Sequence, residues 1–189
     1  MSSHRALFLG TVLVSVAIDQ AVKLWVRSAL YPAESLHLPW PGVFEITLAY
    51  NRGVAFGMLQ GFGVYLFPIA LAICIGAFVY SIRHPHEPKV SHFALALVAG
   101  GAIGNLIDRV LLGKVTDMFW FRLIDFPVFN VADSCITVGT ALLLWRGYRS
   151  SIGPSEKGMQ PEPAPSAEAK PGRPESAEDG VSTEPSSRQ

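Results

Sequence analysis

Residues Ala6–Val26, ALFLGTVLVSVAIDQAVKLWV, indicate the class of fold. This stretch is almost continuously apolar, and at roughly 20 residues it is long enough to cross the hydrocarbon core of a bilayer as a helix. Three more such stretches follow, at Phe62–Ile82, Ser91–Leu111 and Phe129–Arg146. The sequence therefore predicts an all-α membrane protein, a bundle of four transmembrane helices.

The first stretch has a second interpretation as a cleavable signal peptide. His4 and Arg5 precede an uncharged run, as in the first two regions of such a signal. However, Asp19, Gln20 and Lys23 follow where a cleavage site has small residues. We therefore expect a retained anchor helix. Four spans place both termini on one side of the membrane, and the basic residues near the spans show almost no bias that would name that side.

Composition supports a membrane protein and separates a tail from it. Hydrophobic residues make up 50% of the chain and charged residues 16%, whereas soluble domains carry roughly 25% charged residues. The zero net charge, without a basic stripe, argues against nucleic-acid binding. Residues 151–189 hold seven of the 14 prolines and almost no large apolar residues. We predict a membrane domain over residues 1–150 and a disordered Pro/Glu/Ser-rich tail over 151–189.

The loop between the first two predicted spans contains a strand pattern. In Val43–Tyr50, apolar or aromatic residues alternate with other residues, which indicates a strand with one apolar face. Asn51, Arg52 and Gly53 then form a turn signal. We expect a small β-sheet lying at the membrane surface in this loop.

Ionisable residues within membrane spans are costly, so they are either paired or functional. Asp19 and Lys23 are spaced i, i+4 and can pair on one helix face. They could form a structural ion pair or contact a substrate. Asn105, Asp108 and Arg109 share a face of the third span. Asp108 is expected to pair with Arg109, whose guanidinium could also hold a substrate carbonyl.

Asp117 and Asp133 flank the connection between the last two spans. Both should lie near one membrane face, and the apolar segment Met118–Val128, with Pro127 near its end, can fold back to bring them together. Two facing carboxylates cannot both ionise easily, so such a pair can activate water. From the residues alone this pairing is one of several options, because Asp125 is nearby and an intramembrane acid can be structural or bind an ion.

The remaining reactive residues show no arrangement of their own. Cys74 and Cys135 fall within predicted spans and are expected to be buried thiols rather than a disulfide or a metal pair. The histidines lack ligand spacing, so we predict no metal and no cofactor. The histidines are His4, His37, His84, His86 and His92.

Five short motifs occur in a fixed order along the chain. They are Asp19–Lys23, Asn51–Gly57, Gly100–Arg109, Val115–Asp117 and Phe129–Asp133. With these motifs the chain resembles bacterial lipoprotein signal peptidase (signal peptidase II) over roughly residues 6–147. The tail has no counterpart in this resemblance.

The resemblance implies an aspartyl endopeptidase of the bacterial cytoplasmic (inner) membrane. Its termini would be cytoplasmic, and its active site would lie near the outer face. It would cut prolipoproteins just before a diacylglyceryl-modified cysteine, contact membrane lipids and be inhibited by globomycin-type antibiotics. Asp117 and Asp133 match the catalytic pair of the family. The residues implied to bind substrate or support the site are Asn51, Asn105, Arg109, Asn130, Asp19 and Lys23.

Two alternatives belong to other functional classes. A small transporter or channel subunit could use Asp19, Asp108 and Asp133 as an ion or proton path. A membrane scaffold would need no chemistry at all. A transporter favours acids near the bilayer midplane and repeated halves, whereas Asp117 and Asp133 are predicted near one surface and the two halves are unlike.

Overall fold

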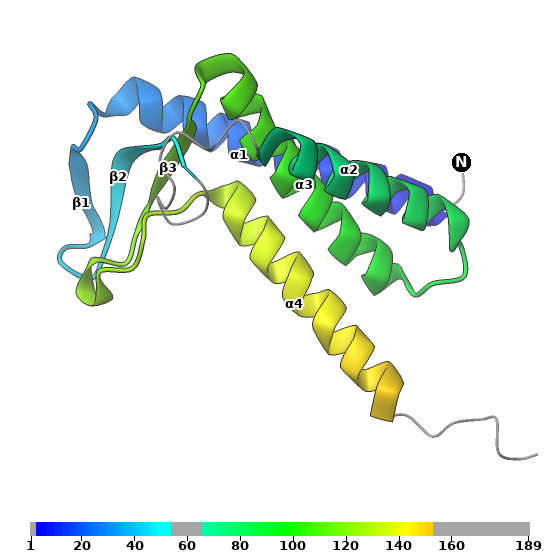
Figure 1. The fold of residues 1–189 in the computed structure, drawn as a ribbon. Helices are drawn as coiled ribbons and strands as arrows, with labels where there is room; N and C mark the ends of the chain where they lie inside the picture. The colour runs from blue at the N-terminus through cyan, green and yellow to red at the C-terminus, as the bar shows by residue number, and fades with distance from the viewer. Residues whose placement is uncertain (1–2, 54–65, 153–189) are drawn as a thin grey trace, which may run out of the picture. The chain divides into compact units, whose positions relative to one another are not determined.

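The computed structural model describes residues 3–53 and 66–152 (Figure 1). The predicted start of the second span, part of the second motif and nearly all of the predicted tail lie outside these residues. The helices and strands are α1 (Ser3–Ala29), β1 (Ser35–Trp40), β2 (Phe44–Asn51), α2 (Leu66–Arg83), α3 (Lys89–Leu112), β3 (Val115–Trp120), the 3₁₀ turn η3 (Arg122–Ile124) and α4 (Val131–Ile152).

Helix α3 is the centre of the helical part, because α1, α2 and α4 all pack against it. Glycines on α3 permit this close approach. A Cβ at Gly101 would collide with the Ala132 carbonyl of α4, and one at Gly104 would lie 2.5 Å from Asp19 Oδ2 of α1. The small residues of the third predicted span therefore act as expected, by letting three helices meet where the polar residues lie.

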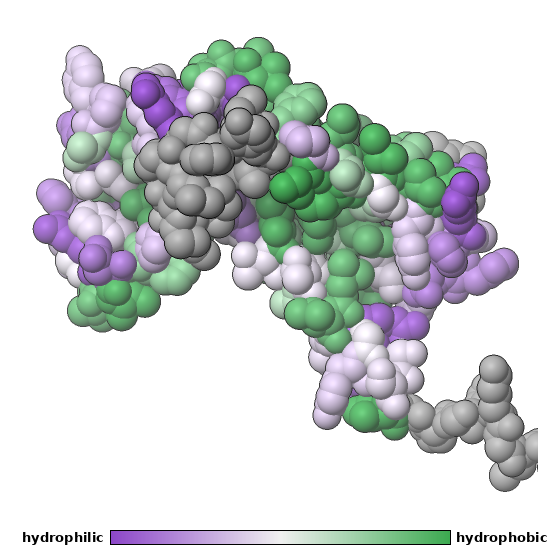
Figure 2. All heavy atoms as spheres, viewed as in Figure 1, coloured by the Kyte–Doolittle hydropathy of each residue, from purple (hydrophilic) through white to green (hydrophobic). Residues whose placement is uncertain are grey.

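Two helices in the described ranges, α1 and α3, are long and apolar enough by themselves to cross a membrane. The described part of α2 is apolar but shorter. Helix α4 has 22 residues but includes Asp133, Arg146 and Arg149, and it is less apolar than α1 and α3. Figure 2 shows apolar side chains over much of the helical surface, as expected for contact with lipid.

Helix α4 differs from its prediction at both ends. The predicted span starts at Phe129, but the helix starts at Val131 because Asn130 caps it and Phe129 pairs with Phe119 in a β-bridge. The helix ends at Ile152, within the first residues of the predicted tail.

The predicted sheet is present and has three antiparallel strands in the order β1-β2-β3. Its packing differs from the expected single apolar face. On β2, Leu48 is buried, but Glu45 and Thr47 on the opposite face are buried as well. Glu45 accepts hydrogen bonds from the Gly42 N–H at 2.9 Å and from Arg122 at 2.9 and 3.1 Å. These bonds, that of Gly42 above all, lower the pKa of Glu45 to about 2, so it is buried as a paired anion.

An apolar cluster joins the sheet to the end of α1. Val26 of α1 and Leu30, which directly follows α1, pack with Leu48 of β2 and Met118 of β3. Each is at most 6% exposed, and full burial of such a side chain contributes roughly 1.5–3 kcal/mol. The cluster fixes β3, and therefore Asp117, relative to α1.

Candidate active site

Strand β3 positions Asp117. In the antiparallel register Asp117 lies opposite Ala49 of β2, and Asn51 is diagonally across on the same face. The Gly53 N–H donates to Asn51 Oδ1 at 2.9 Å, and the Asn51 side chain also hydrogen-bonds to Asp117. The turn predicted at Asn51–Gly53 therefore orients an amide toward this carboxyl group, which is 4% exposed.

The first turn of α4 positions Asp133. Asn130 Oδ1 accepts the Asp133 N–H at 2.9 Å, and Asp133 Oδ2 accepts the Asn130 N–H at 3.2 Å. This reciprocal pair is a capping box, with Asn130 at the N-cap and Asp133 three residues on. Asp133 is therefore fixed by the same bonds that start the helix.

Two asparagine side chains connect the carboxyl groups. Asn130 Nδ2 donates to Asp117 Oδ1 at 2.7 Å and to Asn105 Oδ1 at 3.1 Å. Asn105 Nδ2 donates to Asp133 Oδ1 at 2.8 Å. Asp117 and Asp133, predicted to come together, thus share one hydrogen-bond network with Asn105 and Asn130.

The connection between β3 and α4 folds back as predicted. The Met118 and Phe119 N–H groups both donate to the Phe129 carbonyl, at 3.0 and 2.8 Å, and the Phe129 N–H donates to the Phe119 carbonyl at 3.0 Å. The Phe121 and Phe129 rings stack 5.8 Å apart. Asp125 has a left-handed backbone (φ 47) at the end of η3 and is exposed.

Beneath the carboxyl pair lies a buried charge network. Lys23 Nζ is 2.9 Å from Asp19 Oδ2 and 3.7 Å from Asp108 Oδ2, and all three side chains are at most 1% exposed. Lys23 also donates to Asn105 Oδ1 at 3.0 Å. Asp19 Oδ1 accepts the Ala132 N–H of α4 at 2.9 Å. The predicted Asp19–Lys23 pair is therefore present and is joined to the site through Asn105.

The expected Asp108–Arg109 pair is wrong. Within the described ranges, the cations at ion-pair distance from Asp108 are Lys23, at 3.7 Å, and Arg27, at 3.5 Å. Arg109 Nη1 instead donates to the Asn105 carbonyl at 3.5 Å. Of the acids, Asp133 has the strongest electrostatic interaction with Arg109. Neighbours in sequence lie about 100° apart around a helix. Asp108 therefore faces α1, whereas the Arg109 side chain points in a different direction.

Three further members of this network, Gln20, Arg27 and Thr116, are not predicted by the sequence patterns. Gln20 Nε2 donates to the Gly104 carbonyl at 3.0 Å and to Asp19 Oδ2 at 3.1 Å. Arg27 donates to Thr116 Oγ1 at 2.8 Å, and the Thr116 N–H donates to Asp108 Oδ2 at 2.8 Å. Arg27 could have been found, because it continues the i, i+4 series of Asp19 and Lys23. Thr116 could not, because its contacts depend on how β3 packs.

The two cysteines are free thiols rather than a disulfide, as expected. Cys74 and Cys135 are half-buried, however, whereas the sequence predicted that they would be buried. Within residues 3–53 and 66–152, no three His, Cys, Asp or Glu side chains are grouped so that they could hold a metal ion.

The electrostatics of Asp117 suit acid–base chemistry. Burial first, and then the charge of Asp133, raise its pKa to about 7, against the opposing hydrogen bond from Asn130. Near neutral pH such a pair can hold one proton, so that one carboxyl group donates a proton while the other accepts one.

A family model described as "Signal peptidase (SPase) II" matches residues 11–149. The chain belongs to the signal peptidase II family. All the predicted site residues lie within the matched range. This membership decides against the transporter and scaffold alternatives.

Curated relatives within the signal peptidase II family carry the name "Lipoprotein signal peptidase". The relative from Gloeobacter violaceus is 42% identical over 150 residues, covering 79% of this chain and 86% of that protein. The relative from Streptococcus pyogenes serotype M1 is 39% identical and covers 74% of this chain and 91% of that protein.

Two solved structures, each titled as a bacterial membrane enzyme, share the fold. One superimposes with a TM-score of 0.74 at 30% identity, covering 81% of this chain and 94% of that chain. The other has a TM-score of 0.67 at 29% identity, covering 78% of this chain and 94% of that chain. The likeness supports a membrane-embedded enzyme.

Proposed function

We propose that this protein is an aspartyl endopeptidase that removes signal peptides from prolipoproteins, cutting just before a diacylglyceryl-modified cysteine. The observation that carries the proposal is the pair formed by buried Asp117 and half-buried Asp133, which are joined through hydrogen bonds to Asn130. The names of the relatives support the prolipoprotein substrate.

In the proposed reaction a water molecule between Asp117 and Asp133 attacks the scissile carbonyl carbon. The ionised carboxylate accepts a proton from the water, and the protonated carboxyl group donates a hydrogen bond to the carbonyl oxygen. The tetrahedral intermediate collapses when the C–N bond breaks and the leaving amine takes a proton from the pair. The pair then holds one proton again.

We further propose that all four described helices cross the cytoplasmic membrane, with cytoplasmic termini and the carboxyl pair near the outer face. The support is that Asp117 lies between α3 and α4 and that Asp133 lies in the first turn of α4, which places both at one end of these helices. Asn51 and Arg109 would contact the substrate, and globomycin-type inhibitors would compete for the same groove.

The direct test is incubation of the purified protein with a diacylglyceryl-modified prolipoprotein. We expect release of the intact signal peptide, with the lipidated cysteine as the new N-terminus. The same precursor without the lipid is the matched control, and it should be cleaved poorly. Absence of cleavage with a folded enzyme would contradict the proposal.

Arg109→Lys is expected to lower kcat/KM by roughly 10- to 100-fold. Arg109 is half-buried and interacts with both carboxyl groups. A guanidinium can serve an acid and a substrate carbonyl together, whereas lysine keeps the charge without the planar fork. Loss of one charge-assisted hydrogen bond costs about 1.5–3 kcal/mol. Kinetics on the lipidated substrate measure the effect, and a value within about threefold of the parent would reduce Arg109 to an anchor of α3.

Activity is expected to fall as the pH rises above about 7. Asp117 has its pKa raised from 3.8 to about 7, chiefly by burial. Above that pH the pair loses its last proton and cannot donate to the carbonyl oxygen, so kcat/KM should fall about tenfold per unit.

The same pKa shift affects folding stability. The folded protein binds the Asp117 proton more tightly than the unfolded chain, so this group's contribution is present below pH about 4 and is lost as the pH rises to about 7. Unfolding measured between pH 4 and 8 should show that slope, and Asp117→Asn should lack it. If the stability of the parent relative to Asp117→Asn rose with pH over this range, the raised pKa of Asp117 would be contradicted.

Removal of the tail is expected to leave cleavage unchanged. A chain ending at Gly153 keeps all of α4, which ends at Ile152, and removes a segment almost without large apolar residues. Activity of this chain should lie within about twofold of the parent. A chain ending at Thr140 cuts α4 and is the contrasting control, which should fail to fold. Normal insertion without cleavage in the Gly153 truncation would show that the tail contributes to the reaction.

A further inference from the structure

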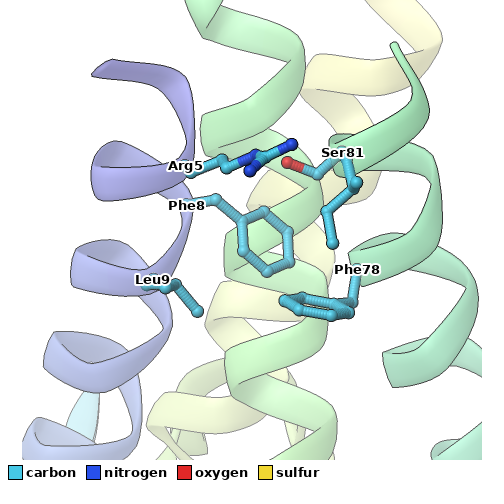
Figure 3. A pocket seen from close by; sticks show the side chains of 6 residues that line it. Arg5, Phe8, Leu9, Phe78 and Ser81 are labelled. Carbon is cyan, nitrogen blue, oxygen red and sulfur yellow. The ribbon is translucent and has the colours of Figure 1, made fainter. Parts of the chain in front are cut away.

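A pocket of about 200 Å³ lies between α1 and α2, near the N-terminus of α1. Figure 3 shows its two ends. The side chains of Arg5 and Ser81 approach one another at one end, and the rings of Phe8 and Phe78 lie at the other. The pocket is far from the carboxyl pair. Asp19 and Lys23, which lie beneath that pair, are several helical turns further along α1.

The apolar end of the pocket is shaped by aromatic and aliphatic side chains. The rings of Phe8 and Phe78 lie 6.2 Å apart between their centres. Leu9 and Ile82 complete this lining. Phe78 is 45% exposed on the helical surface. A hydrocarbon chain of the bilayer could therefore reach this end of the pocket.

The polar end offers a positive charge and a hydroxyl group. Arg5 is exposed, while Ser81 is only 2% exposed and its Oγ is 2.9 Å from His92 Nδ1. His92 is 0% exposed, and its Nε2 has no hydrogen-bond partner in the described part of the chain. When His92 Nδ1 carries the proton it donates to Ser81, and the Ser81 hydroxyl hydrogen is then left to donate to an acceptor in the pocket. A phosphate oxygen held by Arg5 would be such an acceptor.

The surrounding charge favours an anion. Arg83 ends α2 and Lys89 begins α3, so two more exposed cations lie at this end of the helices. The acid in the connecting loop, Glu87, accepts a hydrogen bond from Ser91 at 3.0 Å. Figure 2 shows polar side chains gathered where α2 and α3 are connected. Basic pockets between membrane helices bind anionic lipid head groups.

We propose that this pocket binds an anionic phospholipid, with its phosphate between Arg5 and Ser81 and an acyl chain over Phe8, Leu9 and Phe78. A free phosphate ion would use only the polar end, and a zwitterionic lipid such as phosphatidylcholine would bring a quaternary ammonium beside Arg5 together with its phosphate. The lipid would join α1 to α2, which contact α3 far more than they contact each other. The inference does not rest on the proposed peptidase activity.

The test measures lipid binding to the full-length protein in detergent by native mass spectrometry. The probes are phosphatidylglycerol and phosphatidylcholine with the same acyl chains, and glycerol 3-phosphate, which has none. We expect phosphatidylglycerol to bind roughly ten times more tightly than phosphatidylcholine, and glycerol 3-phosphate to bind negligibly. Equal binding of the two lipids would overturn the proposal, and so would equal binding of glycerol 3-phosphate and phosphatidylglycerol.

Variants assign the preference to this pocket. Arg5→Gln should remove the preference for phosphatidylglycerol, and Ser81→Ala should reduce it by about threefold. Lys89→Gln is the matched control, because Lys89 is an exposed cation at the same end that does not line the pocket. It should keep the preference. Equal losses in Arg5→Gln and Lys89→Gln would show general attraction to a basic surface and overturn the site.

The same variants separate this site from the peptidase site. Cleavage of lipidated precursor in detergent should be within about threefold of the parent for both Arg5→Gln and Lys89→Gln. The lipid proposal is decided by the binding measurements alone, and therefore stands or falls independently of whether the protein cleaves prolipoproteins.

Discussion

Replacement of either Asp117 or Asp133 by asparagine is expected to abolish signal-peptide cleavage while the protein still folds. Asparagine keeps the shape of the carboxyl group but can neither accept the proton of water nor supply an acidic one. Acid–base catalysis by a positioned side chain contributes roughly 100- to 10,000-fold, and both roles are lost here because the two groups act as a unit. Single-turnover cleavage of a lipidated precursor measures the effect.

The asparagine variants should remain folded for reasons visible in the site. Asp117 accepts its hydrogen bond from Asn130 through Oδ1, and an amide oxygen can accept it in the same place. Asp133 accepts the Asn130 N–H as part of a helix cap, where asparagine can also accept. Asp125→Asn is the matched control, because Asp125 is exposed and its left-handed backbone suits asparagine. Near-normal turnover by either site variant would contradict the dyad.

Lys23→Met is expected to destabilise the protein by about 3–5 kcal/mol, because it leaves the buried carboxylate of Asp19 without its cation. Lys23 is 0% exposed and lies 2.9 Å from Asp19 and 3.7 Å from Asp108. Methionine fills similar space but offers no charge. Unfolding of the purified protein in mixed micelles measures the change in free energy.

Two further variants make the Lys23 measurement specific. Lys89→Met removes an exposed lysine at the start of α3 and should change stability by less than about 0.5 kcal/mol. Adding Asp19→Asn to Lys23→Met should restore part of the lost stability, because one unpaired acid becomes neutral. No difference between Lys23→Met and Lys89→Met would show that the buried network contributes little.

The helices could be predicted because bilayer thickness sets the length of an apolar run, and each described helix overlaps its predicted span. The strand β2 was predicted by its alternation, whereas β1 and β3 were not. Strand β1 contains Pro39 and β3 contains the buried Asp117. Both strands depend on pairing with β2, and this pairing cannot be predicted from a short stretch of sequence.

The site was predictable where its contacts are local and not where they cross helices. The i, i+4 spacing of Asp19 and Lys23 predicts their pair correctly. The second anion partner of Lys23, Asp108, was assigned to the adjacent Arg109, because nothing in the sequence indicates the register of α1 against α3. Asn130 and Asp133 carry a capping pattern that could have located the start of α4 at Val131.

The bond from the Ala132 N–H to Asp19 Oδ1 joins the first helix to the last. Because a ribosome delivers α4 after every other described helix, this contact can form only after Ala132 has been synthesised. Until then Asn130 and Asp133 are absent, and Asp117 lacks its bond from Asn130. On the proposed mechanism, a chain interrupted before α4 would therefore lack half of its carboxyl pair and be released as an inert product rather than as an unregulated protease.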